Sequence, residues 1–365
     1  MTADDPKATS SLFDATRLKL AREARGLKKG DLAREVGVTP AAIGQFESGA
    51  AKPRASTLAQ LALALRFPVG FFAYTGEPVR QPDVADTFFR SLRRTKQTDR
   101  QRAIAHATLV SLLLGSLEQR LTLPSVEIPD DLHIQGDVSS DHVEEVAGAV
   151  RRVWEIPSGP VKHVVRLLET KGIVVVRNPS GYDIDAFSAW YPARPIVVLA
   201  DDKGSFERSR FDAAHELGHL VMHADPAPGD RVLETQAHRF ASAFLMPRND
   251  IIEQLPGNRV DWQGLVALKR VWGVSIQALL YRARTLGTLS ELSYENAVRT
   301  INRRGWRRQE PGYLGPPEEP RLINAALEKL EELGMSMDDL ARETNLGPVV
   351  LAELVGSAGT TVVHL

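Results

Sequence analysis

The sequence predicts a mainly α protein with a small β-sheet, an α+β fold, on the strength of three observations. Apolar residues recur at helical spacing near the N-terminus, as in Leu27, Leu32 and Val36, which is the pattern of amphipathic helices. Short β-branched runs lie in the middle of the chain, at Ile173–Val176 and Ile196–Leu199, and these favour strands. Helical spacing then returns and continues towards the C-terminus. A length of 365 residues corresponds to two or three domains at about 100–200 residues each.

Taken in order, the predicted elements are short helices separated by breakers. Residues 1–11 are predicted to be a frayed terminus, and short amphipathic helices follow over 13–72, with Gly37 between two of them. The segments 75–87 and 303–320 are rich in Pro, Gly or charge and are predicted to be linkers. Ala186–Trp190 is a third strand, and helices are expected over about 97–121, 141–154, 159–171, 205–223, 232–245 and 261–286, and again in the last 45 residues.

Composition excludes several classes of protein and of site. There are no cysteines, so disulfides, thiol catalysis and cysteine zinc sites are excluded, and a bound metal would rest on His, Asp or Glu. The longest uncharged apolar run, Leu109–Leu117, is far short of the ~20 residues that span a bilayer. The N-terminal MTADDPKATS is acidic and polar, unlike a signal peptide. We therefore expect a cytoplasmic protein with no membrane partner.

The formal net charge of −1 conceals an asymmetry between the two ends. Residues 1–100 carry 17 Lys and Arg against 11 Asp and Glu, a charge of +6, whereas residues 310–365 carry 3 against 10, a charge of −7. A basic N-terminal region and an acidic C-terminal region predict different partners for the two ends. The basic region is compatible with nucleic acid, although many solvated surfaces carry such a charge.

Residues 28–48 show a helix-turn-helix pattern. Gly37 ends one helix, Thr39 can cap the next, and Pro40 suits its first turn. Such a pair of helices can place the second in the major groove of double-stranded DNA, where the amide of Gln45 can read adenine. The alternative is a unit that only packs or dimerises. Basic side chains near the Gln45 amide can contact the phosphates of the DNA backbone. The predicted DNA-facing residues are Lys28, Lys29, Thr39, Pro40, Ala41, Gln45, Lys52 and Arg54.

The strongest signal is the sequence His215-Glu216-Leu-Gly-His219. On a helix the two histidines lie one turn apart on one face, so both imidazoles can bind one Zn²⁺, and Glu216 can take a proton from a metal-bound water. His223 lies about 12 Å from His215 along the axis, which is too far for three turns to converge easily. A carboxylate from the segment that begins at Glu234 is the better third ligand. The alternative is a helix with ordinary structural histidines.

The N-terminal motif resembles the XRE/Cro-type helix-turn-helix family over about residues 13–72. One departure from that family is Lys29, which stands where Gln is common and so favours a phosphate contact over a base contact. The residues that fall at the family's core and turn positions are Leu32, Ala33, Gly37, Val38, Ile43, Phe46, Glu47, Gly49 and Pro53.

The stretch Arg210–Pro247 resembles the ImmA/IrrE family of zinc metallopeptidases. An Arg210-Phe211 pair precedes the histidine motif, and the following helix ends in Leu-Met-Pro247, as in that family. His238 stands where many relatives have Asn. The resemblance covers about 140–286 and implies a zincin-like domain. Joined to the N-terminal resemblance, it indicates a fused XRE–ImmA/IrrE regulator with a C-terminal extension.

The resemblance also implies roles for individual residues. His215, His219 and Glu234 would bind one Zn²⁺, and Glu216 would be the general base. Nothing in the sequence selects a group that stabilises the oxyanion, and the alternatives left open are His223, His238 and Tyr191.

A short internal repeat links the two ends of the chain. Asp31-Leu-Ala-Arg-Glu35 recurs as Asp339-Leu-Ala-Arg-Glu343, and the ungapped match extends to seven identities in twenty. The C-terminal region is either a second helix-turn-helix-shaped unit or an unrelated set of amphipathic helices. The predicted domains are the helix-turn-helix domain at 1–74, a linker and helical connector at 75–139, the metallopeptidase domain at 140–302 and the acidic helical region at 303–365.

These observations together predict a DNA-binding transcriptional regulator with a zinc-dependent peptidase domain. Its substrate would be a partner protein, such as a repressor or the product of a neighbouring gene. The competing hypothesis is a non-proteolytic repressor or antitoxin-like protein whose zinc domain senses or scaffolds. We expect a homodimer on a two-fold DNA site.

Overall fold

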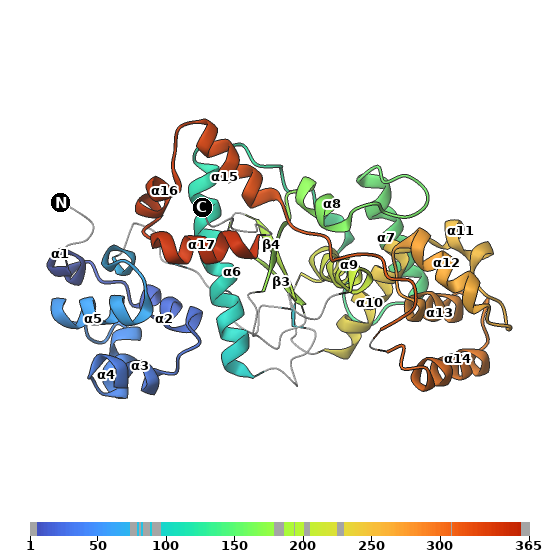
Figure 1. Cartoon of the computed structure of the whole chain (residues 1–365), viewed down its shortest axis with the longest axis horizontal. Coiled ribbons are helices and arrows are strands. Elements are labelled where there is room, and N and C mark those ends of the chain that lie inside the picture. Colours follow the sequence, from blue (N-terminus) through green and yellow to red (C-terminus); the bar gives the residue numbers. More distant parts are fainter. Residues whose placement is uncertain are drawn as a thin grey trace.

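The N-terminal part of the chain is a group of short helices (Figure 1). This computed structural model describes residues 6–73, 79, 82, 88–89, 96–178, 186–192, 194–200, 205–224, 230–307 and 309–358. Gly37 ends the third helix with a left-handed φ of 74°, a conformation that glycine adopts without a Cβ penalty, and the Thr39 side chain caps the fourth by accepting from the Ala42 amide. The elements are α1 (Pro6–Ser11), α2 (Ala15–Ala24), α3 (Lys29–Val36), α4 (Pro40–Glu47), α5 (Ala55–Leu65) and η1 (Val69–Phe72).

A mixed sheet of four strands lies in the middle of the molecule, in the order β1-β3-β4-β2. Strands β2 and β4 are parallel, whereas β3 runs antiparallel to both β4 and β1. The strands are β1 (Phe88–Phe89), β2 (Val174–Arg177), β3 (Ala186–Trp190) and β4 (Pro195–Leu199). The helices around them are α6 (Gln97–Glu118), η3 (Asp130–Leu132), α7 (Ser140–Val153), α8 (Val164–Thr170), α9 (Phe206–Met222) and α10 (Arg231–Leu245).

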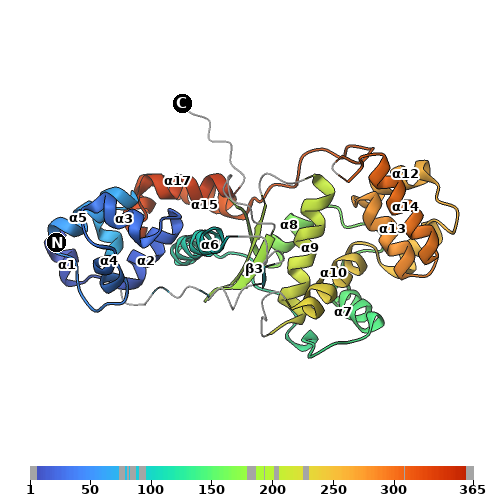
Figure 2. The same cartoon turned by 90° about the horizontal axis from the view of Figure 1, so that it is seen from below.

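The sheet separates two hydrophobic cores. In β4, Ile196 and Val198 belong to one core and Val197 and Leu199 to the other, because successive side chains of a strand point to opposite faces. The first core continues into the N-terminal helices, α6 and the C-terminal helices, and the second into α7, α9 and α10. Figure 2 shows α6 on one side of β3 and α9 on the other.

The C-terminal third of the chain forms two further helical groups. One group lies beyond α10, and the other returns past the sheet to lie beside α6 and the N-terminal helices (Figures 1 and 2). No helix in the described part of the chain is long and apolar enough to cross a membrane. The predicted fold class, mainly helical with a small sheet, is confirmed. The remaining elements are α11 (Arg248–Ile251), η4 (Ile252–Gln254), α12 (Trp262–Trp272), α13 (Ile276–Thr285), α14 (Glu291–Arg303), α15 (Leu322–Glu332), α16 (Met337–Thr344) and α17 (Gly347–Ser357).

Two segments differ from the sequence-based expectation. Residues 6–11 are not frayed but form α1, and the Ser10 hydroxyl donates to the Pro53 carbonyl at 2.7 Å. Residues 309–320 contain no helix or strand, yet the buried Lys269 pairs with Glu310 at 3.1 Å and the buried Arg210 pairs with Glu318. These long-range contacts are invisible in local composition. The predicted linker over 75–87 lies almost entirely outside the described residues.

A buried histidine joins α6 to α17. His106 Nε2 lies 3.0 Å from the Ser357 hydroxyl oxygen. Because that hydroxyl donates to the Leu354 carbonyl at 2.6 Å, His106 is the donor and carries its proton on Nε2. Burial, and then the positive charge of Arg102, lower the pKa of His106 from 6.5 to about 4. The imidazole is therefore neutral in the folded chain near pH 7.

Acid is expected to destabilise the chain through His106. Between pH 6.5 and 4 the unfolded chain binds a proton here that the folded chain does not, so the free energy of unfolding falls as the pH falls. From pH 7 to pH 5 the expected loss from this residue is about 2 kcal/mol. Urea unfolding at pH 7 and pH 5 should show that the free energy of unfolding falls more for the wild-type chain than for His106→Gln. Equal losses would contradict the assignment.

Candidate metal centre and DNA-facing surface

Helix α9 places two histidines side by side. The helix begins after Ser205, whose side chain accepts a hydrogen bond from the Arg208 amide, and continues through the histidine motif to Met222. Because four residues make about one turn, His215 and His219 share one face. Their ring centroids are 4.8 Å apart, and each side chain is 1% exposed.

Glu234 of α10 completes a cluster of three donor groups. Its carboxylate oxygens lie 3.4 Å from His215 Nε2 and 3.6 Å from His219 Nε2, and the two Nε2 atoms are 3.1 Å apart. Donors about 2.0–2.1 Å from one tetrahedral ion would lie about 3.3 Å from each other. Two imidazoles and a carboxylate are also a donor set that Zn²⁺ uses where one coordination position stays open. We refer to these three residues as the donor cluster, and its chemistry and spacing fit a zinc ion.

Electrostatics keep the Glu234 side chain ionised. Burial alone raises the pKa of this carboxyl, but hydrogen bonds and positive charge from His215 and His219 outweigh burial and hold the pKa well below its usual range. A carboxylate anion, the form that binds metal ions, therefore faces the two imidazoles.

The close approach of α10 to α9 depends on Gly218. A Cβ at this position would lie 3.0 Å from the Phe240 ring, and Phe240 is fully buried in a packed core, where a shift of the ring disturbs its neighbours. Asp230 caps the N-terminus of α10 and sets Glu234 in the first turn. The glycine inside the histidine motif thus lets Glu234 reach the histidines of the neighbouring helix.

Glu216 is held from the side of the sheet. Its side chain is fully buried, and the Ser188 hydroxyl of β3 donates to Glu216 Oε2 at 2.7 Å. Ser188 is itself fully buried, so its hydroxyl has a fixed position. Ser188 was not among the residues that the sequence predicted for the site. A polar residue in the otherwise apolar run of Ala186–Trp190 was the available signal.

A chain of hydrogen bonds supports His219 from the side opposite the donor cluster. His219 Nδ1 lies 3.0 Å from His223 Nδ1, His223 Nε2 lies 3.0 Å from Gln236 Oε1, and the Gln236 amide nitrogen donates to the Gly136 carbonyl at 2.8 Å. Because the Gln236 side-chain nitrogen donates to the Gly136 carbonyl, the Gln236 side-chain oxygen accepts a hydrogen bond from His223 Nε2. His223 Nδ1 then carries no proton and accepts a hydrogen bond from His219 Nδ1. The lone pair of His219 Nε2 is thereby directed at the donor cluster.

Burial, followed by the charge of His219, lowers the pKa of His223 to about 4, so His223 is neutral near pH 7. A neutral ring can accept at Nδ1 and donate at Nε2, as the hydrogen-bond chain requires. Gln236 was not predicted from the sequence, because the hydrogen-bond chain joins α9, α10 and the loop at Gly136.

All eight predicted DNA-facing residues are exposed. The Lys29 ammonium lies 3.3 Å from Glu47, which also accepts from Arg22 at 3.2 Å. The Lys52 ammonium donates to the Ser11 carbonyl at 2.7 Å. Gln45 is exposed on α4. The surface therefore has an accessible side-chain amide as well as basic side chains.

Comparison with known families gives two matches within the chain. Residues 18–72 match the model described as Helix-turn-helix, and residues 168–284 match the peptidase M78 model described as IrrE N-terminal-like domain. The chain joins a helix-turn-helix to an IrrE-like domain. The fusion expected from the sequence is thus confirmed, and the chain combines a DNA-binding regulator with a peptidase-like domain. No curated protein was found to match the chain.

The three residues left open as oxyanion stabilisers have different surroundings. The Tyr191 hydroxyl donates to the Ile104 carbonyl of α6 at 3.4 Å, and its ring belongs to the core on the far side of the sheet from α9. The His238 ring packs against Phe211 and Tyr281, with centroids 4.9 and 4.8 Å apart. His223 contacts His219 through Nδ1, and His238 lies one helical turn after Glu234 on α10, so the sheet separates Tyr191 from the donor cluster but does not separate the two histidines from it.

Proposed function

We propose that the chain is a transcriptional regulator whose IrrE-like domain is a zinc-dependent endopeptidase acting on a partner protein, such as a repressor or the product of a neighbouring gene. The observation that supports this most strongly is the donor cluster lying beside Glu216, a buried carboxylate with its own hydrogen-bond donor. Three protein donors leave a fourth position for water or substrate, as catalytic zinc sites do.

Each residue of the site has a distinct role in this proposal. His215, His219 and Glu234 hold the ion. When bound, Zn²⁺ lowers the pKa of a coordinated water and polarises a peptide carbonyl. Glu216 accepts the proton of the attacking water and returns it to the departing amine. Ser188 fixes the orientation of the Glu216 carboxylate through its hydrogen bond, so that Glu216 would act as a base from one defined position.

The competing hypothesis is a non-proteolytic repressor or antitoxin-like protein whose zinc domain senses or scaffolds. A scaffold needs the donor cluster but has no use for a buried base, and burying a carboxylate costs free energy. The fully buried Glu216 and its Ser188 partner therefore favour the enzyme. Incubating the zinc-loaded chain with the product of the neighbouring gene separates the two, since defined fragments support the enzyme and an intact partner supports the scaffold.

The Ser188→Ala variant is expected to lower kcat by about 10–100-fold with little change in KM. The substitution removes the hydroxyl that orients Glu216 but leaves all three metal donors, so zinc content should stay at one ion per chain. Ser242→Ala is the matched control, because Ser242 is also a buried serine and its hydroxyl has no hydrogen-bond partner among the described residues. Equal kcat values for the two variants would contradict a positioning role for Ser188.

DNA binding by the helix-turn-helix is expected to fall steeply with salt. Lys29→Ala should weaken binding to all sequences alike and reduce the salt slope by about 1, whereas Gln45→Ala should relax preference at one base by about 1–3 kcal/mol. Lys329→Ala, a lysine of the acidic C-terminal region, is the control and should change neither. Gel-shift titrations measure these effects, and salt-insensitive binding would count against the assignment. We expect the bound species to be a homodimer on a two-fold site.

A further inference from the structure

The C-terminal helices repeat the helix-turn-helix at a constant offset of 308 residues. Helices α3 and α16 have the same bounds after this shift, and the bounds of α15 and α17 agree with those of α2 and α4 within two residues. The turns repeat as well. Gly26 and Gly334 have φ of 65° and 84°, and Gly37 and Asn345 have φ of 74° and 52°, all left-handed.

The N-terminal helices α2 to α4, Ala15–Glu47, are called the first unit, and its buried positions coincide with those of the C-terminal helices too. Leu32 corresponds to Leu340 and Ile43 to Leu351, and none of these four side chains is more than 1% exposed. A short run of identities in amphipathic helices can arise by chance, but chance does not reproduce helix bounds, left-handed turns and core positions together. Residues 322–358 therefore repeat the helix order, the turns and the buried positions of the first unit, and we call them the second unit.

The second unit lacks the charge that DNA binding needs. Residues 322–358 carry seven Asp and Glu against two Lys and Arg, a charge of −5, and α17, the counterpart of α4, contains no Lys or Arg. Phosphate contacts supply much of the affinity for DNA, so this surface repels it. Glu353 of α17 instead binds Arg25 of the first unit, with both carboxylate oxygens 2.8–2.9 Å from the guanidinium.

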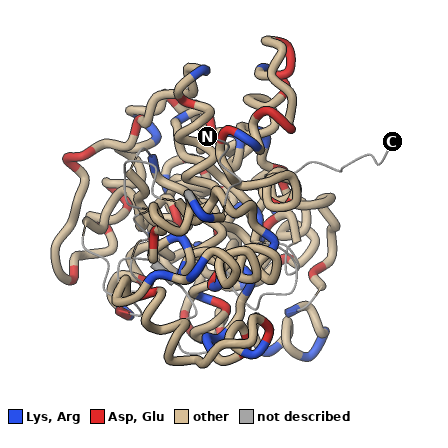
Figure 3. Tube along the Cα trace, turned by 90° about the vertical axis from the view of Figure 1, so that its left-hand side faces the viewer, with Lys and Arg blue, Asp and Glu red and all other residues tan. Residues whose placement is uncertain are grey.

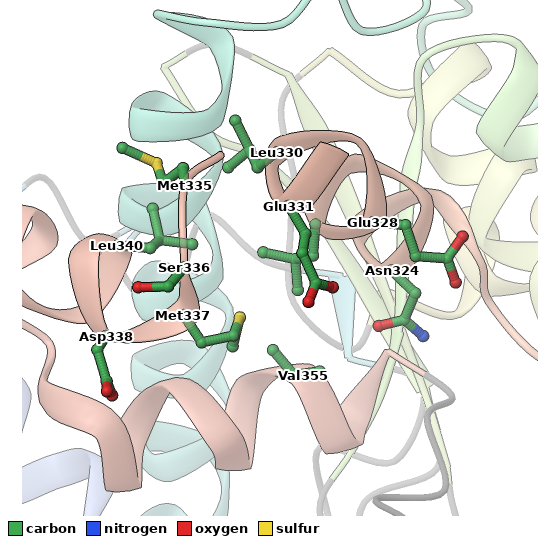
Figure 4. A pocket seen from close by; sticks show the side chains of 11 residues that line it. Asn324, Glu328, Leu330, Glu331, Met335, Ser336, Met337, Asp338, Leu340 and Val355 are labelled. Atoms are coloured by element: carbon green, nitrogen blue, oxygen red, sulfur yellow. The ribbon is translucent and has the colours of Figure 1, made fainter. Parts of the chain in front are cut away.

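A pocket has opened in the second unit where the first unit has a charge cluster. In the first unit, Arg22 and Lys29 both bind Glu47 and fill the space between α2, α3 and α4. The corresponding residues of the second unit are Leu330, Met337 and Val355. All three line a pocket of about 450 Å³, shown in Figure 4, a volume typical of ligand sites.

The pocket has an apolar floor and an acidic rim. Leu330 is 2% exposed at the floor, whereas Met337 is 43% exposed and accessible from outside. Glu328, Glu331 and Asp338 are among the lining residues, and all three are exposed. In Figure 3, seen from the end that carries the first unit, Asp and Glu mark the projection at the top, where the turn between α15 and α16 lies in Figure 1.

These features define the chemistry of an occupant. Every lining residue lies on α15, α16, α17 or the turn between α15 and α16, so no strand edge is available to pair with an extended peptide. The remaining common mode for an apolar groove between helices is an amphipathic helix that inserts apolar side chains. The acidic rim requires that this helix carry Lys or Arg beside its apolar face.

We propose that the second unit is a former helix-turn-helix that now binds a basic amphipathic helix of a partner protein in this pocket. This site is separate from the donor cluster and from the DNA-facing surface, so the partner recruited here need not be the peptidase substrate. The first unit keeps its charge cluster and its DNA role. The second unit has apolar residues at the three cluster positions, and its negative charge and the absence of Lys and Arg from α17 do not suit DNA.

The test measures fluorescence anisotropy of labelled synthetic peptides with the full chain. One peptide is an amphipathic helix of about 18 residues with leucines on one face and lysines on the other, and its twin has glutamates in place of the lysines. The wild-type chain should bind the lysine peptide only, and more weakly at high salt. The Met337→Lys variant, which restores the residue of the first unit at an exposed position, should bind at least tenfold more weakly.

Two further variants and one control separate loss of the site from loss of folding. Leu330→Arg, Met337→Lys and Val355→Glu together rebuild the charge cluster of the first unit and should abolish binding. Glu328→Gln with Glu331→Gln keeps the pocket and should weaken binding and its salt dependence, whereas Glu295→Gln on the distant α14 should have no effect. Equal binding of both peptides, no binding by the wild-type chain, or undiminished binding by Met337→Lys would overturn the proposal.

Discussion

The Glu216→Gln variant is expected to lose cleavage of its partner protein by about 10²–10⁴-fold, the contribution typical of a general base. The amide occupies the same volume and still bonds to the Ser188 hydroxyl, but it cannot accept the proton of the attacking water. The substitution does not touch the three metal donors, so zinc content should remain one ion per chain. DNA binding should equal that of the wild-type chain, because residue 216 lies outside the helix-turn-helix.

Three measurements on one preparation make this prediction specific. Fragment yield from the neighbouring-gene product reports the chemistry, metal analysis reports the donor cluster, and gel shift reports the DNA-binding domain. A variant that loses cleavage, zinc and DNA binding together is misfolded. In that case Glu216→Asp is used instead, since it keeps a carboxylate on a side chain one methylene shorter and should show partial activity. Cleavage by Glu216→Gln at the wild-type rate would remove Glu216 from the mechanism.

The Glu234→Ala variant is expected to lose stoichiometric zinc. It removes the anionic donor of the cluster and leaves two imidazoles with Nε2 atoms 3.1 Å apart, and two ligands are fewer than the three or four that zinc sites use. His219→Ala should have the same effect. Metal analysis after dialysis measures both, and loss of zinc should carry loss of cleavage with it.

Glu253→Ala is the matched control for this experiment, since Glu253 is exposed on η4 and its replacement makes the same chemical change away from the cluster. It should retain one zinc ion per chain. Full zinc retention by Glu234→Ala would contradict the assignment of the third ligand and direct attention to His223, one turn beyond His219, or to His238, one turn beyond Glu234.

Local spacing was enough to anticipate the pair of histidines, because a four-residue separation on a helix fixes which side chains share a face. Glu234 was identified through the family resemblance, since helix spacing alone says only that a neighbouring helix supplies a carboxylate. Ser188 and Gln236 could not be predicted in this way. Their contacts to Glu216 and His223 join a strand and a second helix to α9, and such contacts depend on tertiary packing.

Dependence on tertiary packing also explains where the predicted fold was wrong. Glycine and proline content marks residues 309–320 as irregular, and the segment contains no helix or strand. Its attachment to the IrrE-like domain depends on Glu310 and Glu318, which bind the buried cations Lys269 and Arg210. In a sequence, a glutamate in a Pro-rich stretch looks the same whether it is solvated or buried against a cation.

The proposed peptidase activity is tested most directly in the native host, by placing Glu216→Gln at the chromosomal locus. Expression of the genes that the chain regulates is then measured under conditions that induce them in the wild type. The proposed mechanism predicts that these genes stay uninduced while the variant protein accumulates, keeps its zinc and occupies its DNA sites. Normal induction would contradict the peptidase and leave a DNA-binding regulator whose zinc domain only senses or scaffolds.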